Sequence, residues 1–200
     1  MRNAPLCCLL LAATLAAIAP ASAQQSALVA QRNLDQLTDR AALILRGHVV
    51  SARVEKHPQF PALDTVAVTV QVRETLKGTA QRTHTFRQYL WDIRDRQDAN
   101  GYRKGQDLLL FLIAPSAHGL SSPAGLDQGR FRIERDAAGQ EVAVNGQGNF
   151  RLFDGLAGEA AKEGAALSAA SLRLIDSPPR GPVAVADLMR LVREFAAVDR

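Results

Sequence analysis

The strongest constraint on the fold is a stretch of alternating valines at residues 66–73, which reads VAVTVQVR. Every second residue is a valine, and small or polar residues stand between them. A period of two places one set of side chains on each face of an extended chain. The stretch therefore predicts a half-buried antiparallel strand, and Leu76-Lys77-Gly78 predicts the turn that ends it.

Further segments have strand-like patterns. Residues 43–56 form a long candidate strand in which Gly47 predicts a β-bulge or a tight bend. The other candidates are residues 83–91, the apolar run 106–114, and a hairpin made by 129–136 and 140–145. Five or six strands, mostly consecutive and antiparallel, predict a mainly β protein with a closed or half-open barrel.

Helical patterns flank these strands. Residues 27–40 contain spaced leucines and predict a short lead-in helix. Near the carboxyl end a stripe of apolar residues has helical spacing and predicts an amphipathic helix; it consists of Val185, Leu188, Met189, Val192 and Phe195. Residues 155–182 are rich in Ala, Gly and Pro and predict a mobile linker.

The first residues are typical of an export signal. Arg2 precedes an apolar run at residues 6–18, and Ala21-Ser22-Ala23 predicts cleavage after Ala23. The run is shorter than the about 20 residues that span a bilayer, so we expect no membrane span. The sequence thus predicts an exported protein, periplasmic or extracellular. Its expected parts are a signal peptide (1–23), a β-barrel domain (24–154), the linker (155–182) and the last helix (183–200).

Cysteine content and charge narrow the function classes. Both cysteines, Cys7 and Cys8, lie in the signal segment, so the mature chain has no disulfide, metal thiolate or cysteine nucleophile. The mature chain would carry 23 basic and 20 acidic side chains, a net charge of +3. The excess is concentrated in residues 82–104, where the interspersed signs indicate either a solvated connection or a basic face.

The order of several segments resembles a group of uncharacterised exported bacterial proteins. The segments are DRAALILRGHVVSARVE, TVAVTVQVRETLKG, KGQDLLLFL and GLDQGRFRIERDAAG, within residues 39–145. The first part also resembles the netrin-like domain of the tissue inhibitors of metalloproteinases. That resemblance implies a five-stranded barrel of the oligonucleotide/oligosaccharide-binding (OB) type.

The sequence departs from the inhibitors at the mature amino terminus. The inhibitors present a cysteine there, whose amine and carbonyl chelate the protease zinc, and they are held together by disulfides. This chain would begin at Gln24 and has no cysteine after the signal. The resemblance therefore implies a barrel whose rim or first segment meets a protein partner, without that zinc-chelating chemistry.

Motifs for catalysis, metals or cofactors are lacking. Lys77 lies between two candidate strands rather than in a glycine-rich phosphate loop, so a turn is favoured over an anion-binding lysine. Residues 96–107 partly match a calcium loop, but Arg96 stands where a carboxylate is required. The four histidines have no zinc-site spacing. We therefore expect no catalytic residues, no metal and no cofactor.

One aromatic and basic group is the best candidate for recognition. It consists of Arg87, Tyr89, Trp91, Arg94, Tyr102 and Arg103. Aromatic residues beside arginines dominate protein-binding surfaces, and the alternative is that Tyr89 and Trp91 close the end of the barrel core. An exported protein of low net charge is not expected to bind nucleic acid.

Three hypotheses remain open. The first, which we favour, is a secreted or periplasmic protein-binding module, an inhibitor or partner of an exported protein. The second is a hydrolase of envelope or extracellular polymers, with a pocket that gathers a histidine and carboxylates such as Asp92 or Asp107. The third is a structural envelope protein that uses the linker and last helix as a docking arm.

Overall fold

The structure of the chain is a computed structural model that describes residues 30–90 and 93–198. The predicted signal segment, its cleavage site, Trp91 and the candidate carboxylate Asp92 lie outside the described residues. In chain order the elements are α1 (Leu34–Arg40), β1 (Leu43–Lys56), β2 (Asp64–Lys77), β3 (Thr83–Tyr89), the 3₁₀ turn η2 (Ile93–Arg96), β4 (Asp107–Leu112), the 3₁₀ turn η3 (Leu126–Gly129), β5 (Arg130–Arg135), β6 (Glu141–Asn145), α2 (Leu156–Glu163), α3 (Ala169–Asp176), β7 (Val183–Ala184) and α4 (Val185–Ala196).

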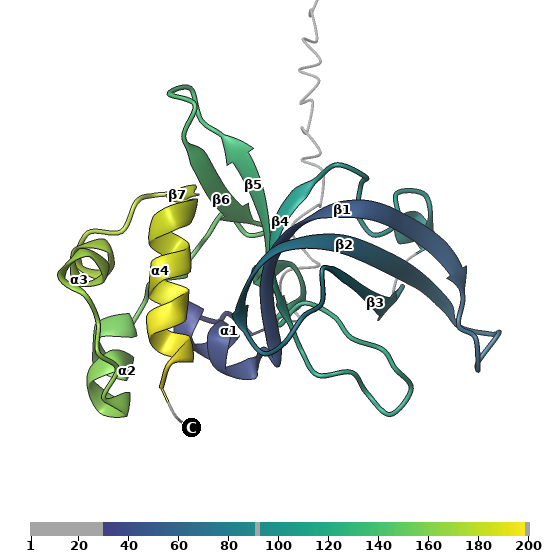
Figure 1. The fold of residues 1–200 in the computed structure, drawn as a ribbon, viewed down its shortest axis with the longest axis horizontal. Coiled ribbons are helices and arrows are strands. Elements are labelled where there is room, and N and C mark those ends of the chain that lie inside the picture. Colours follow the sequence, from purple (N-terminus) through teal and green to yellow (C-terminus); the bar gives the residue numbers. More distant parts are fainter. Residues whose placement is uncertain (1–29, 91–92, 199–200) are drawn as a thin grey trace, which may run out of the picture.

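The strands form one antiparallel sheet, which confirms the prediction of a mainly β protein. The strand order is β3-β2-β1-β4-β5-β6-β7. Figure 1 shows β1 and β2 as long, curved strands, with the four helices grouped at the other end of the molecule. The predicted barrel of five or six strands is not confirmed, because the sheet has seven strands and its terminal strands, β3 and β7, do not pair.

The valine alternation sets the register of the longest strand pair. Val66, Val68 and Val70 are fully buried, and the residues between them face outward. The predicted irregularity at Gly47 is present, since the register of β1 against β2 shifts between Arg46 and Gly47. A Cβ atom at Gly47 would lie 2.4 Å from the carbonyl oxygen of Gln71. Only glycine lets the two backbones approach this closely.

The Leu-Lys-Gly sequence at the end of β2 has a structural role. Gly78 turns the chain with a φ of 74°, a conformation that glycine adopts without strain. The Lys77 Nζ donates to the carbonyl oxygens of Thr38, at 2.7 Å, and Asp39, at 3.2 Å. These carbonyls belong to the last turn of α1, where a cation is favourable. Lys77 thus fastens the first helix to the sheet.

A short connection lies along the open side of the curved sheet. After β4 the chain forms an isolated antiparallel bridge between Leu112 and Pro123, and a parallel bridge between Arg87 of β3 and Leu120. The Ser121 amide donates to the Arg87 carbonyl at 2.8 Å. The segment 120–124 therefore contacts both β3 and β4, although it is not a strand of the sheet.

Two apolar cores occupy the two faces of the sheet. The concave face encloses side chains of β1 to β4, among them Leu45, Val68, Phe86 and Leu110, together with Tyr102. The other face carries the larger core, which includes Phe111 and Phe131 at a ring separation of 5.4 Å and the buried sides of the helices. Among the described helices, none is long and apolar enough to span a bilayer.

The predicted mobile linker is instead largely helical. It contains α2 and α3, whose Leu156, Ala160 and Ile175 belong to the larger core. Alanine has the highest helix propensity, and Ser168 caps α3 by accepting from the Ser171 amide. The glycines indicated a flexible linker, but two of them, Gly155 and Gly164, are the caps of α2.

The last helix packs on its own sheet. The predicted apolar stripe is buried on α4, and the helix contacts α1, α3, β2 and β6. Within the part of the chain that the structure describes, α4 is therefore a component of the core rather than a free arm. This removes the observation on which the structural-envelope hypothesis depended.

Candidate functional site

The predicted recognition residues fall into two separate groups. Arg87 and Tyr89 lie on β3, which is an edge strand, and Arg94 is exposed on η2. Tyr102 and Arg103 lie in the connection before β4. The structure thus divides the predicted surface into a β3 side and a β4–β5 side.

On the outer face of β3, Arg87 is held by its neighbours. Its guanidinium donates to Glu55 Oε1 at 2.5 Å and to Thr65 Oγ1 at 3.2 Å. The Arg87 and Glu55 side chains are both partly exposed, so the ion pair contributes little to the free energy of unfolding. The backbone of Arg87 pairs with a different segment, because its carbonyl accepts a hydrogen bond from the loop after β4 rather than from β2.

A slot opens beside this edge, between β3 and the loop that follows β4. We call this cavity of about 270 Å³ the β3 slot. One wall is residues 84–87 of β3, and the other wall comprises Ala42, Leu43, Leu112, Ile113, Pro115, Gly119 and Ser121. Most of that second wall is apolar. The slot lies where segment 120–124 leaves β3, so the curved sheet is interrupted there.

Two hydrogen bonds show which backbone groups of β3 face the slot. The Arg82 carbonyl accepts from Val72 of β2, whereas the Arg87 carbonyl accepts from Ser121. Backbone groups of successive strand residues alternate in direction, so the even-numbered residues of β3 pair with β2 and the odd-numbered residues point away. The N–H and C=O groups of Thr83 and Thr85 are therefore directed to the free edge.

His84 is the histidine of the slot. It is partly buried and stacks on Phe86 with ring centroids 6.5 Å apart. Burial lowers the pKa of His84 below its usual value of 6.5, since desolvation disfavours the charged ring. At neutral pH the imidazole of His84 is therefore neutral, and the charged side chain that lines the slot is Arg87, which is paired with Glu55.

Tyr102, in the connection before β4, is buried in the concave core rather than exposed. It is 2% exposed, and its ring meets Phe86 edge-on at 5.7 Å. Its hydroxyl donates to the Gln88 side chain at 3.2 Å. Burial raises the pKa of Tyr102 to about 12, outweighing the opposite influence of Arg130. Tyr102 is therefore a core residue, a position that was predicted only for Tyr89 and Trp91.

Arg130 and Arg132 are additional residues of this region that our sequence analysis did not single out. With Arg103 and Glu134 they line a cavity of about 360 Å³ whose floor includes Leu108. We call it the arginine pocket. The alternation of GRFRIER could have revealed it, because a period of two places Arg130, Arg132 and Glu134 on one face of β5.

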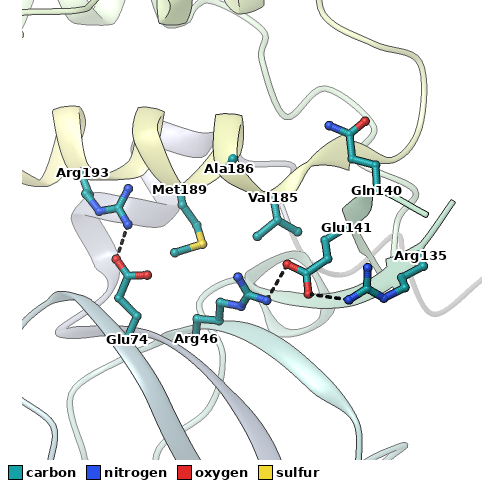
Figure 2. A pocket seen from close by; sticks show the side chains of 9 residues that line it. All are labelled: Arg46, Glu74, Arg135, Gln140, Glu141, Val185, Ala186, Met189 and Arg193. Atoms are coloured by element: carbon teal, nitrogen blue, oxygen red, sulfur yellow. Dashed lines mark hydrogen bonds and ion pairs between the residues drawn. The ribbon is translucent and has the colours of Figure 1, made fainter. Parts of the chain in front are cut away.

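The largest of the four described cavities, about 590 Å³, lies between α4 and the sheet. Figure 2 shows Glu141 between Arg46 and Arg135, and Arg193 of α4 directed at Glu74 of β2. The Arg46–Glu141 separation is 2.8 Å. Val185 and Met189 extend from α4 toward the same space. Each of the three arginines of this groove is paired with one of its two glutamates, so we interpret the groove as an ion-paired seam that holds α4 and the β5–β6 hairpin on the sheet.

A hydrolase site would combine a histidine with a carboxylate, and none of the four described cavities does so. Asp107 is paired with Arg73 at 3.3 Å. His57 is buried, its Nε2 lies 2.8 Å from the His118 carbonyl oxygen, and its Nδ1 accepts from two backbone amides. Both of its nitrogens are thus used to hold a loop.

Three carboxylates meet where α1 faces α2. Oxygens of Asp35, Glu159 and Glu163 lie within 4.8 Å of one another. The same hollow is lined by basic side chains, Arg32, Arg40 and Lys162. This countercharge is typical of an ion-pair network at a helix junction.

Comparison with models of known protein families finds no match for this chain. Searches among curated proteins and among solved structures likewise find no significant similarity.

Proposed function

We propose that the mature chain is an exported protein-binding module that takes up an extended segment of its partner along the free edge of β3. The observation that carries the proposal is the β3 slot, in which the backbone groups of Thr85 face an apolar wall. The backbone groups of Thr83 continue the same free edge beyond the slot. Unpaired groups at a sheet edge are a template for another strand. Addition of a strand to such an edge is a recurrent mode of peptide recognition.

The strand connections support an OB-like barrel, as the resemblance to netrin-like domains implies. β1 pairs with both β2 and β4, β3 pairs with β2, and segment 120–124 bridges β3 in parallel and β4 in antiparallel. In this proposal segment 120–124 is a shortened closing strand. The partner's segment continues it past Thr85 and Thr83, where the chain itself has turned away.

The slot also defines what the partner segment contains. Backbone hydrogen bonds to Thr83 and Thr85 require an extended chain without proline at the paired positions. Leu43, Leu112 and Ile113 are suited to an apolar side chain of the partner. A neutral His84 adds no charge to the slot. The proposed ligand is therefore an extended, apolar segment of a protein.

We also propose that the protein is exported and that it binds its partner without catalysing a reaction. The export signal at residues 1–23 is the support for a periplasmic or extracellular location. The hydrolase alternative has no supporting observation among the described cavities.

The test uses two substitutions at one exposed position of β3. Thr85→Pro removes the amide that faces the slot, and it leaves the pairing with β2 in place because the Thr85 amide points away from β2. Thr85→Val keeps that amide and serves as the matched control. Residues 24–200 of the wild type and both variants would be used to select binders from a random peptide library displayed on phage.

We expect apolar peptides that bind the wild type and Thr85→Val with similar affinity and bind Thr85→Pro about tenfold or more weakly. Thermal unfolding of the three proteins checks that Thr85→Pro remains folded. Selected peptides that bind all three equally would refute the proposal, and so would a selection that yields no binder of the wild type.

A further inference from the structure

We propose a second site, independent of the β3 slot: the arginine pocket binds a phosphate group. Three arginines and one glutamate line it, so its lining carries a net positive charge. The arginines come from two segments, Arg103 from the loop before β4 and the other two from β5. Planar guanidinium groups donate paired hydrogen bonds that match phosphate oxygens.

Arg130 is the fixed member of the pocket. Its Cζ lies 4.7 Å from the centre of the Tyr102 ring, a cation–π contact, and its Nη1 donates to the Asn100 carbonyl at 2.6 Å. Its Nη2 lies 2.7 Å from a carboxylate oxygen of Asp127. The side chain is 19% exposed, whereas that of Asp127 is 60% exposed. The guanidinium is therefore held in position, and its carboxylate partner lies mostly in water.

Arg103 and Arg132 retain donors for a ligand. Arg132 uses its Nε toward Glu134 at 3.2 Å, which leaves its terminal nitrogens. Both members of that pair are more than half exposed, and such pairs are weak. The Arg103 guanidinium has no ion-pair partner among the residues that the structure describes.

The loop that carries Arg103 is fixed before any ligand binds. The Arg103 amide donates to the Gln106 side chain at 2.9 Å, and that side chain donates to the Gly101 carbonyl at 3.3 Å. Three successive residues, Ala99, Asn100 and Gly101, have left-handed backbone angles of 53°, 57° and 74°. This turn places Tyr102 in the core and Arg103 at the pocket. A preformed loop reduces the entropy lost when an anion binds.

The experiment measures binding of inorganic phosphate by NMR, at constant ionic strength, through the arginine Nε–H signals of residues 24–200. The site variants are Arg103→Gln and Arg132→Gln, and the matched control is Arg53→Gln, which removes the same charge from an exposed position on β1. Arg130 is left intact because its substitution would disturb the Tyr102 contact. A second arm uses phosphatidylglycerol vesicles, with phosphatidylcholine vesicles as the uncharged comparison.

We expect saturable shifts in the wild type and in Arg53→Gln, and about tenfold or more weaker binding in each site variant. Loss of vesicle binding in the same variants would assign the phosphate to a lipid headgroup, and phosphate binding without vesicle binding would assign it to a soluble ligand. Equal weakening in Arg53→Gln would show a general charge effect and overturn the proposal. Absence of saturable binding to both phosphate and vesicles would overturn it as well.

Discussion

Asn149 should be one of the residues on which the stability of the fold depends most. It is buried, and its backbone has a left-handed φ of 61°. Its side-chain oxygen accepts from the Asn145 amide at 2.9 Å. Its side-chain nitrogen donates to the carbonyl oxygens of Ala143, at 2.9 Å, and Gly181, at 2.8 Å. One amide therefore joins the end of β6 to the chain that enters β7.

The cost of replacing Asn149 follows from these contacts. Each hydrogen bond contributes about 1 kcal/mol, so three lost bonds lower the free energy of unfolding by about 3 kcal/mol. Alanine also suffers about 1 kcal/mol or more of strain at a left-handed φ, which glycine does not. We expect about 4 kcal/mol for Asn149→Ala and about 3 kcal/mol for Asn149→Gly.

Urea unfolding followed by far-ultraviolet circular dichroism gives both values by linear extrapolation. The comparison of the two variants separates the hydrogen bonds from the backbone strain. Losses under about 1 kcal/mol in both variants would show that the amide network contributes little. An alanine variant as stable as the glycine variant would show that the left-handed backbone at Asn149 carries no strain.

Three further predictions use the same unfolding measurement. Gly47→Ala places a methyl group against the Gln71 carbonyl and should cost about 2 kcal/mol or more. Lys77→Met removes the bonds to the last turn of α1, including that to Thr38, and should cost about 1 to 2 kcal/mol. The pKa of an unfolded tyrosine is about 10, and burial raises the pKa of Tyr102 to about 12. The protonated Tyr102 should therefore contribute to the free energy of unfolding below pH 10, and this contribution should be lost as the pH rises toward 12. Tyr102→Phe should weaken this alkaline loss, and identical pH profiles for the two proteins would contradict the assignment.

Strands β1 to β6 were predictable because their signals are local, whereas the two-residue strand β7 lies in the segment predicted as the start of the last helix. Alternation over residues 66–73 and the apolar run around β4 each report the environment of neighbouring side chains, and Gly47 marked its bulge by its type alone. The α2–α3 region was not predicted, because alanine and glycine together fit a linker and a capped helix equally well. Deciding between the two requires knowing that Leu156 and Ile175 have a core to contact.

The candidate site was predictable only in part, for a related reason. Arg87 and Arg103 were recognised by their residue type. The burial of Tyr102 depends on left-handed residues before it, and Arg130, which joins Arg103 in the arginine pocket, lies 27 positions after Arg103 in the chain. A stretch of sequence shows which side chains are available. The pairing of β4 with β5 decides which of them meet.

The division of the predicted surface has a physical basis in the concave core. Phe86 contributes to the wall of the β3 slot, and the same ring packs against Tyr102. Tyr102 in turn supports the guanidinium of Arg130 in the arginine pocket. Its hydroxyl also binds Gln88, two residues further along β3 from Phe86. Tyr102, which the sequence pattern placed on the surface, therefore connects the two proposed sites from inside, because it contacts both Phe86 and Gln88 of β3.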